Sequence, residues 1–279
     1  MAAKQRKPPF WRRVEPNPKY DIAVLRPAKL RKGQRFETLA DAREESERSE
    51  TLLRSFPGGS REVAEFLQEC RAGYYECNKP FCPICARQFR RWFVGELLRV
   101  TEGRDDVHIY TILLKEAAKD KIDALDLTPF HASLRKRLKR SGMGNVPVIG
   151  GFEIVYKAAR QVWVLHINLV MIGGDKSGRR KFKEKFQRDD VDRPLVRAAL
   201  KDRAEQLSYV LKFTTYHRPY EQQGATRSPA KPLNASEHAA LLKWMSQYEF
   251  EDFLLLINAR RQGGNEIVLS SPKASKNQS

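Results

Sequence analysis

The sequence predicts an α+β fold in which helices back an antiparallel sheet. Runs of alternating apolar and polar residues, rich in β-branched side chains, indicate strands, and apolar residues three or four positions apart indicate helices. Four cysteines within sixteen residues (70–85) mark a further small unit. Because 41% of the 279 residues are hydrophobic, the chain can bury a core, which excludes wholesale disorder.

The first hundred residues are predicted to be mostly helical. Residues 1–36 are basic and rich in proline, so we expect an arm. A charged helix follows over 38–55 and ends at a Phe-Pro-Gly-Gly sequence. Ser60 can cap a short helix that leads to Cys70, and an amphipathic helix is expected over 86–100.

The following residues are predicted to form the sheet. We expect a strand at 107–114, a helix over 128–140, and two strands at 147–157 and 162–172 joined by a short turn. A long helix over about 194–213 completes the order β-α-β-β-α. That order matches a ferredoxin-like antiparallel sheet backed by two helices.

The charge balance favours a polyanionic partner. The chain has 52 Lys and Arg against 34 Asp and Glu, a formal charge of +18, and cationic side chains displace the counterions condensed on nucleic acids. The densest basic runs, 135–140 and 179–188, are each typical of a solvated helix face when taken alone. Together with the overall charge they favour nucleic-acid binding, to DNA or to RNA.

Nothing in the sequence indicates a membrane or an export signal. No stretch approaches the ~18 apolar residues of a spanning helix, and the N-terminus has no apolar segment of the signal-peptide kind. We therefore expect a soluble, cytoplasmic protein that does not bind membranes.

The four cysteines predict a structural zinc site. Clustered cysteines in a reducing compartment hold metal more often than they pair. In Cys82-Pro-Ile-Cys85 the spacing suits tetrahedral Zn²⁺ with bonds of about 2.3 Å, and Cys70 and Cys77 supply two further thiolates. The alternative is ligation by Cys77, Cys82 and Cys85 with another ligand, which leaves Cys70 as a packing thiol.

One face of the predicted 162–172 strand carries a candidate site for a second metal. Alternation places His166 and Asn168 side by side on the face opposite the apolar one. Folding the hairpin about its turn places Glu153 opposite His166, within the ~5 Å of a cross-strand pair. These ligands suit Mg²⁺ or Mn²⁺. An ordinary polar face is the alternative, and His108 on the preceding strand is either a further ligand or only a strand residue.

The predicted 194–213 helix supplies a candidate nucleophile. Glu205, Tyr209 and Lys212 have the i, i+4, i+7 spacing of one helix face. A phenol beside a metal-bound phosphodiester can attack phosphorus, and its phenolate can leave again. Lys212 can stabilise the phenolate or phosphate, and Glu205 can activate a water or a second hydroxyl. A tyrosine in such a helix is otherwise an ordinary core or rim residue.

Taken in order, these pieces resemble the HUH endonuclease superfamily, and within it the bacterial plasmid rolling-circle replication initiators. The resemblance rests on the cysteine knuckle with its Arg- and Trp-bearing helix, the strand HIYTILL, the hairpin GGFEIVY…VWVLHINLV and the segment SYVLKF, and covers roughly residues 70–215. It implies an enzyme that recognises single-stranded or hairpin origin DNA, nicks one strand and transfers it. It also implies a 5′-phosphotyrosine, a 3′-hydroxyl that primes a host polymerase, and a host helicase as a candidate partner.

The resemblance also assigns roles to single residues. His166 matches the first histidine of the His-hydrophobic-His signature, Tyr209 the nucleophile, Lys212 the lysine of Tyr-x-x-Lys, and Glu153 an acidic residue on the preceding strand. The chain departs from the signature at Asn168, where the second histidine is expected. Some relatives carry glutamine there, and a neutral oxygen should weaken transition metals more than Mg²⁺.

Two further functions are consistent with the same residues. A relaxase or transposase of this superfamily would use the same chemistry on another DNA end. A non-catalytic, zinc-containing DNA-binding protein would bind DNA in a salt-sensitive way without forming a covalent adduct.

The expected organisation has five parts. They are the arm and charged helix (1–59), the zinc-knuckle segment and its helix (60–104), the HUH-type nuclease core (105–215), a C-terminal helical region (216–261) and a disordered tail (262–279).

Overall fold

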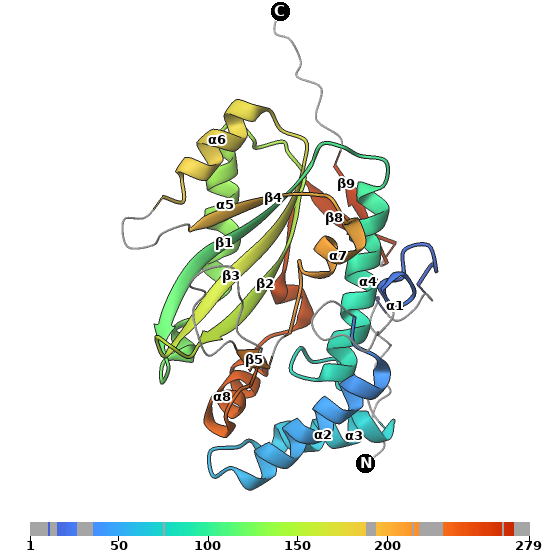
Figure 1. Cartoon of the computed structure of the whole chain (residues 1–279), viewed down its shortest axis with the longest axis vertical. Coiled ribbons are helices and arrows are strands. Elements are labelled where there is room, and N and C mark those ends of the chain that lie inside the picture. Colours follow the sequence, from blue (N-terminus) through green and yellow to red (C-terminus); the bar gives the residue numbers. More distant parts are fainter. Residues whose placement is uncertain are drawn as a thin grey trace, which may run out of the picture.

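Five antiparallel strands form the central sheet, in the order β4-β1-β3-β2-β7, and helices cover both of its faces (Figure 1). The predicted α+β class is therefore confirmed. The structure is a computed structural model that describes residues 11, 16–26, 36–74, 76–187, 194–213, 215–217, 231–263 and 265–270. None of the helices in these ranges is both long enough and apolar enough to cross a membrane.

The sheet strands are β1 (Val107–Ala118), β2 (Val148–Lys157), β3 (Val162–Ile172), β4 (Leu195–Ala199) and β7 (Leu254–Ile257). Two short ribbons pair β5 (Tyr216–His217) with β6 (Lys231–Pro232), and β8 (Ala259–Gln262) with β9 (Glu266–Leu269). The α-helices are α1 (Ile22–Leu25), α2 (Leu39–Ser55), α3 (Arg61–Ala72), α4 (Pro83–Thr101), α5 (Thr128–Arg140), α6 (Lys176–Glu184), α7 (Arg203–Ser208) and α8 (Ala235–Met245). Two 3₁₀ turns, η2 (Ile122–Ala124) and η3 (Phe250–Phe253), complete the described elements.

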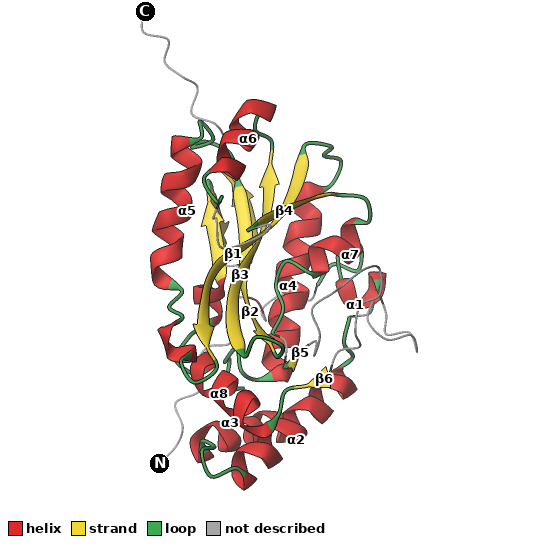
Figure 2. Cartoon of the chain, turned by 60° about the vertical axis from the view of Figure 1, so that its left-hand side comes forward, coloured by secondary structure: helices red, strands yellow, loops and turns green. Residues whose placement is uncertain are grey.

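The two faces of the sheet carry different helices. Helices α5 and α6 lie on one face, and α4 and α7 on the other (Figure 2). On the first face His131 of α5 contacts Phe152 of β2, with ring centroids 5.1 Å apart, and Phe182 of α6 meets Tyr110 of β1 at 6.1 Å. This face includes the apolar side chains of β3, as strand alternation predicts.

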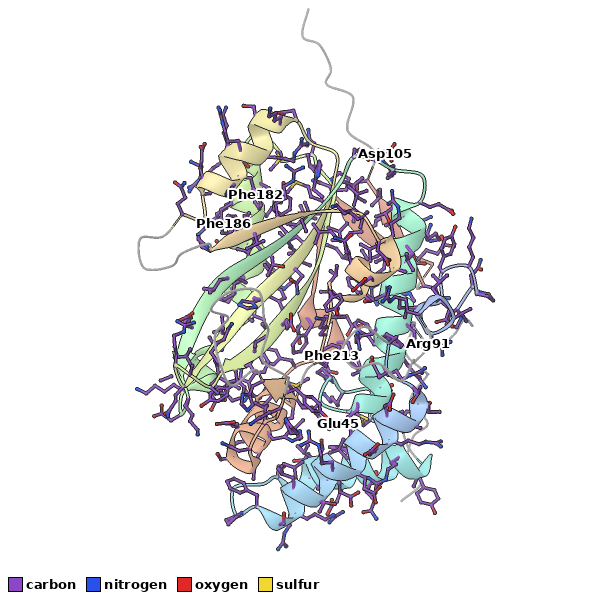
Figure 3. The ribbon with its side chains drawn as sticks, viewed as in Figure 1. Glu45, Arg91, Asp105, Phe182, Phe186 and Phe213 are labelled. Atoms are coloured by element: carbon purple, nitrogen blue, oxygen red, sulfur yellow. The ribbon has the colours of Figure 1, made fainter. Side chains whose placement is uncertain are left out.

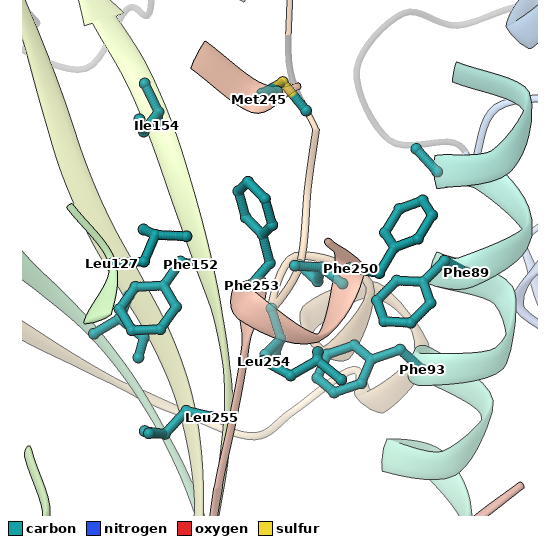
Figure 4. Close-up of a cluster of buried hydrophobic side chains, with 14 of the residues drawn as sticks. Phe89, Phe93, Leu127, Phe152, Ile154, Met245, Phe250, Phe253, Leu254 and Leu255 are labelled. Carbon is teal, nitrogen blue, oxygen red and sulfur yellow. The ribbon is translucent and has the colours of Figure 1, made fainter. Parts of the chain in front are cut away.

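Aromatic side chains join α4 to the β7 edge of the sheet. Phe89 of α4 stacks on Phe250 of η3, with centroids 4.4 Å apart, and Phe93 and Leu254 are buried beside them (Figure 4). Trp11 packs edge-on against both Phe89 and Phe250. Part of the predicted N-terminal arm is therefore packed in the core, because burying an aromatic side chain is strongly favourable.

The prediction of a long helix over 194–213 is wrong. Residues 195–199 form the edge strand β4, paired with β1, and the helix is confined to Arg203–Ser208. Leu, Arg and Ala in this stretch favour a helix, but the open edge of β1 supplies backbone partners that override local propensity. The second helix beside the sheet is α6, in a stretch interpreted from the sequence only as a basic run.

The C-terminal part also differs from its prediction. The expected helix over 235–260 ends at Met245, after which η3, β7 and β8 follow. Residues 266–269 form β9, so the prediction of a disordered tail is wrong for this stretch; residues 271–279 lie outside the described residues. Alternation explains β7, because Leu255 and Leu254 face opposite sides of the sheet and both are buried.

A buried histidine joins α8 to α2. His238 is fully buried, and its Nε2 lies 3.2 Å from the Ser49 hydroxyl and 3.9 Å from a Glu45 carboxylate oxygen. Burial, aided by the charge of Arg48, lowers the pKa of His238 to about 4, although Glu45 acts in the opposite direction. The folded protein therefore holds this imidazole neutral at pH values where an unfolded chain would protonate it.

We expect this histidine to make the fold acid-sensitive. The unfolded chain binds the additional proton, so stability falls as pH drops from 6.5 toward 4, by roughly 3 kcal/mol for a shift from 6.5 to about 4. The free energy of unfolding, obtained by urea denaturation at several pH values from 7 to 4.5, tests this expectation, with the His238→Gln variant as the comparison. The wild-type curve should fall more steeply than the variant's, and parallel curves would contradict the assignment.

Candidate metal centre and active site

Four buried cysteines converge at the junction of α3 and α4. One ligand atom from each of Cys70, Cys77, Cys82 and Cys85 lies within 4.8 Å of all the others. The sulfur of Cys70 is 3.5 Å from those of Cys82 and Cys85, and the Cys77–Cys85 separation is 3.7 Å. Tetrahedral geometry with 2.3 Å bonds requires sulfurs roughly 3.8 Å apart. The cluster is thus positioned to bind a metal ion and is compatible with structural zinc.

Local backbone features bring the thiols together. Helix α3 ends after Cys70 with Gly73 in the left-handed region (φ 80°), which turns the chain toward Cys77. Cys82 is the N-cap of α4, with Pro83 in the first turn, so Cys85 follows one helical turn later. Cys82 makes no capping hydrogen bond, because its side chain faces the other sulfurs.

The sulfurs strongly perturb one another. Hydrogen bonding from Cys77, followed by the other thiols, lowers the pKa of Cys70. The same Cys70 contact raises the pKa of Cys77. Four thiolates around one metal leave no open coordination position, so a metal here would organise the α3–α4 junction without taking part in chemistry. Cys70 belongs to the cluster, as the four-cysteine prediction required.

The β2–β3 hairpin pairs the residues that the sequence placed together. Glu153 is the cross-strand partner of His166, and Gly151 that of Asn168. Asn168 is 7% exposed; its amide nitrogen donates to Glu153 Oε2 at 3.2 Å, and its Oδ1 accepts from the Thr111 hydroxyl at 2.7 Å. Hydrogen bonds therefore join Glu153 of β2, Asn168 of β3 and Thr111 of β1 into one polar row across the sheet.

His166 is electrostatically suited to act as a ligand. Burial lowers its pKa; Lys157 acts in the same direction, and the Glu153 carboxylate opposes the shift. A neutral imidazole retains the lone pair that metal binding needs.

His108, the further candidate ligand, lies on the other face of the sheet. It pairs with Met171, whereas Thr111 of the same strand pairs with Asn168. Side chains three positions apart on a strand point to opposite faces, so His108 cannot join His166. It lies instead beside Arg197 of β4, with 3.3 Å between Nδ1 and the guanidinium.

The chain around Tyr209 lies on the same face of the sheet as the polar row. A Cβ on Gly151 would come within 2.6 Å of the Val210 carbonyl oxygen and 2.9 Å of the Leu211 side chain. Arg90 of α4 holds this segment from the other side, because its guanidinium donates to the carbonyls of Leu211 (2.9 Å) and Ser208 (3.4 Å). Since Gly151 is opposite Asn168, the Tyr209 segment lies next to the candidate site.

Lys212 and Tyr209 meet, but not on the face of one helix. Helix α7 ends at Ser208, Tyr209 is its C-cap, and Lys212 lies beyond it. The Lys212 ammonium lies 3.4 Å from the centroid of the Tyr209 ring, and the tyrosine is 37% exposed. Glu205, in the first turn of α7, lies 3.6 Å from Arg26. The expectation that a continuous helix aligns all three side chains is therefore wrong.

Three contributing residues escaped sequence reasoning. Thr111 could be placed only with the β1–β3 register, which contains an irregularity between Leu113 and Lys115. Arg90 belongs to the predicted 86–100 helix and Gly151 to the motif GGFEIVY, and neither pattern indicates a role for the single residue. Comparisons with protein-family models, with curated proteins and with solved structures found no match to this chain.

Loss of one cysteine should remove the metal. We expect wild-type protein to contain about one zinc per chain and Cys82→Ser to lose it, because three sulfurs cannot complete the tetrahedral shell. Metal analysis and thermal unfolding measure the two effects. Ile84→Val, between two ligands, is the matched control and should keep its metal at a cost of about 1 kcal/mol. A zinc-free Cys82→Ser protein with wild-type stability would contradict a structural metal.

Proposed function

We propose that this protein nicks one strand of DNA by metal-assisted attack of Tyr209, in the manner of the HUH plasmid rolling-circle replication initiators. The observation that supports the proposal most is the position of the Tyr209 segment. It packs at Gly151, opposite Asn168 and two residues from Glu153, on the face that carries His166. The segment of the candidate nucleophile and the three candidate ligand residues thus lie on one side of the sheet.

The strand order also supports the proposal. The run β1-α5-β2-β3-α6-β4, with spatial order β4-β1-β3-β2, agrees with a ferredoxin-like unit, to which β7 is added. The helices differ from the expected ones, because α6 takes the place given to the 194–213 helix. Both helices of that unit, α5 and α6, lie on one face of the sheet (Figure 2), and the Tyr209 segment packs on the other face at Gly151.

The polar row could hold Mg²⁺ or Mn²⁺ after one local change. Asn168 now directs its amide nitrogen toward Glu153. A 180° flip of the amide would place its oxygen beside the Glu153 carboxylate, and these two residues would then offer oxygen ligands of the kind that Mg²⁺ or Mn²⁺ prefers. The Thr111 hydroxyl would tolerate that flip, because it can accept a hydrogen bond as well as donate one.

The reaction would be a transesterification. The metal would polarise a phosphate oxygen of the scissile linkage. Tyr209 oxygen would bond to phosphorus while the bond to the 3′ oxygen breaks, which leaves a 5′-phosphotyrosine and a 3′-hydroxyl. The phenolic proton would be taken by a base, for which Glu205 is the sequence candidate, and the departing 3′ oxygen would gain a proton. The Lys212 ammonium would offset the negative charge near the phenol.

The asparagine at position 168 favours a second candidate function, that of a non-catalytic DNA-binding protein. A relaxase or transposase would share the chemistry above, whereas a zinc-containing DNA-binding protein would not need a metal on the hairpin. The hydrogen bonds of Asn168 with Thr111 and Glu153 give both the oxygen and the nitrogen of its amide a partner without an ion. A protein of this second kind binds DNA and forms no adduct.

The nucleophile can be tested directly. We expect a covalent protein–DNA adduct on a denaturing gel when wild type meets Mg²⁺ or Mn²⁺ and labelled single-stranded hairpins with randomised loops. Tyr209→Phe should abolish it, since the attacking oxygen is removed. Tyr216→Phe, another exposed tyrosine, should leave it intact. An adduct that survives in Tyr209→Phe would show that another residue is the nucleophile. If the protein binds DNA but forms no adduct with any hairpin, the non-catalytic function is favoured.

The selectivity between Mn²⁺ and Mg²⁺ should depend on which residue occupies position 168. Asn168→His adds a second imidazole, so we expect tighter Mn²⁺ binding with little change for Mg²⁺. Titration calorimetry measures both ions, and Glu153→Gln is the control that should weaken both. Equal Mn²⁺ affinities in wild type and Asn168→His would remove residue 168 from the ligand set.

A further inference from the structure

A basic pocket lies between α6 and β4, on the face of the sheet opposite the Tyr209 segment. It has a volume of about 540 Å³. Its lining includes Lys176, Arg179, Arg180 and Lys183 of α6 and Arg197 of β4. The four α6 residues are spaced i, i+3, i+4, i+7, which places them along one face of the helix.

The core fixes this basic face of α6 in place. Phe182 is fully buried and meets Tyr110 edge-on, and Phe186 packs against Phe182 with centroids 5.0 Å apart (Figure 3). Gly178 lies against Met143, where an added Cβ would come within 2.8 Å of the Met143 side chain. The helix is thus anchored through one side, and its cationic side is turned toward the pocket.

A buried hydroxyl lies at the base of the pocket. Tyr110 lines it and is 1% exposed, yet its hydroxyl has no hydrogen-bond partner among the residues that the structure describes. Burial raises the pKa of Tyr110, and the Arg197 and Arg179 guanidiniums oppose the rise, so both charges act on this hydroxyl. A buried hydroxyl without a partner is costly, and an oxyanion ligand would satisfy it.

Among the residues that the structure describes, acidic groups only partly offset this charge. Glu184 lies 3.7 Å from Arg180, and Asp175 caps the start of α6 through the Gly178 amide. Arg179 donates to the Gly174 carbonyl and Arg197 to His108, so both guanidiniums are held by neutral groups and keep their charge for a ligand. The segment 188–193, which includes three aspartates, lies outside the described residues.

The pocket suits contact with the backbone of a nucleic acid. The described residues around it offer no exposed aromatic ring on which a base could stack. The nearby aromatic residues, Tyr110, Phe182 and Phe186, are all buried and cannot stack on an exposed base. Cations along a helix face instead suit phosphates, which position a nucleic acid without reading its sequence.

We propose that the α6–β4 pocket binds a backbone phosphate of double-stranded DNA, with Lys183 and Arg197 as contacts and the Tyr110 hydroxyl as a hydrogen-bond donor. The proposal goes beyond the nicking function, because it requires no cleavage. It gives the protein two DNA contacts, on opposite faces of the sheet and separated by the β4 edge.

Charge-matched variants of one helix test the proposal. Lys183→Ala and Lys181→Ala remove the same charge from α6, and both lysines are exposed, but only Lys183 lines the pocket. With a labelled 20-base-pair duplex of arbitrary sequence, we expect Lys183→Ala combined with Arg197→Ala to weaken binding at least about tenfold. The salt slope should fall by roughly one to two, the loss of one or two phosphate contacts. The Lys181→Ala variant should bind the duplex nearly as tightly as wild type. An equal loss of duplex affinity in Lys181→Ala and Lys183→Ala would overturn the assignment of the pocket as the binding site.

A second variant tests the hydroxyl. Tyr110→Phe removes an oxygen that has no partner, so the fold should be at least as stable as wild type, while duplex affinity falls. Unchanged duplex affinity would remove Tyr110 from the site. Inorganic phosphate could instead stabilise wild type while the variant with both Lys183→Ala and Arg197→Ala binds the duplex as tightly as wild type. That result would show a site for a free anion and would overturn DNA as the ligand of the pocket. Tighter binding of duplex RNA than of duplex DNA would overturn it too.

The two proposals fail separately. The double variant at Lys183 and Arg197 should still form the Tyr209 adduct with single-stranded hairpins, because the residues on the other face are untouched. A wild type without adduct but with pocket-dependent duplex binding would contradict only the nicking function. Wild-type duplex binding by the double variant would contradict only the pocket.

Discussion

The antiparallel register of β2 against β3 determines where all the candidate chemistry lies. It places Glu153 beside His166 and Gly151 beside Asn168. A slip of one residue would turn these side chains to the face that α5 and α6 cover. Gly151 has a second consequence, because the missing side chain lets the Val210–Leu211 backbone lie directly on the sheet.

Helix α4 connects the cysteine cluster to this site. Two of the four thiols lie at its start, and Arg90, less than two turns from Cys85, holds the carbonyls on either side of Tyr209. Phe89 and Phe93 on the same helix fill the core next to β7. A metal at the cysteines would therefore fix the helix that holds the Tyr209 segment, and it would take no part in the proposed reaction.

The sheet separates two electrostatic environments. Its α4 face carries the polar row of Glu153, Asn168 and Thr111, where a cation is proposed to bind. Its α6 face carries a group of fixed cations around a buried hydroxyl, suited to an anion. His108 illustrates the division, because strand alternation places it with Arg197 on the cationic side and away from the other candidate ligands.

Short-range patterns determined what the sequence could show by itself. Cysteine spacing, the hairpin turn and strand alternation predicted the cysteine cluster, the Glu153–His166 pair and the apolar face, because each depends on residues near in the chain. Only the tertiary structure decided which side of the sheet His108 joins, that 195–199 forms a strand, and that Lys212 meets Tyr209 outside a helix. Those outcomes depend on an open strand edge, on the β1 register and on close packing at Gly151, which are contacts between distant segments that local propensity does not encode.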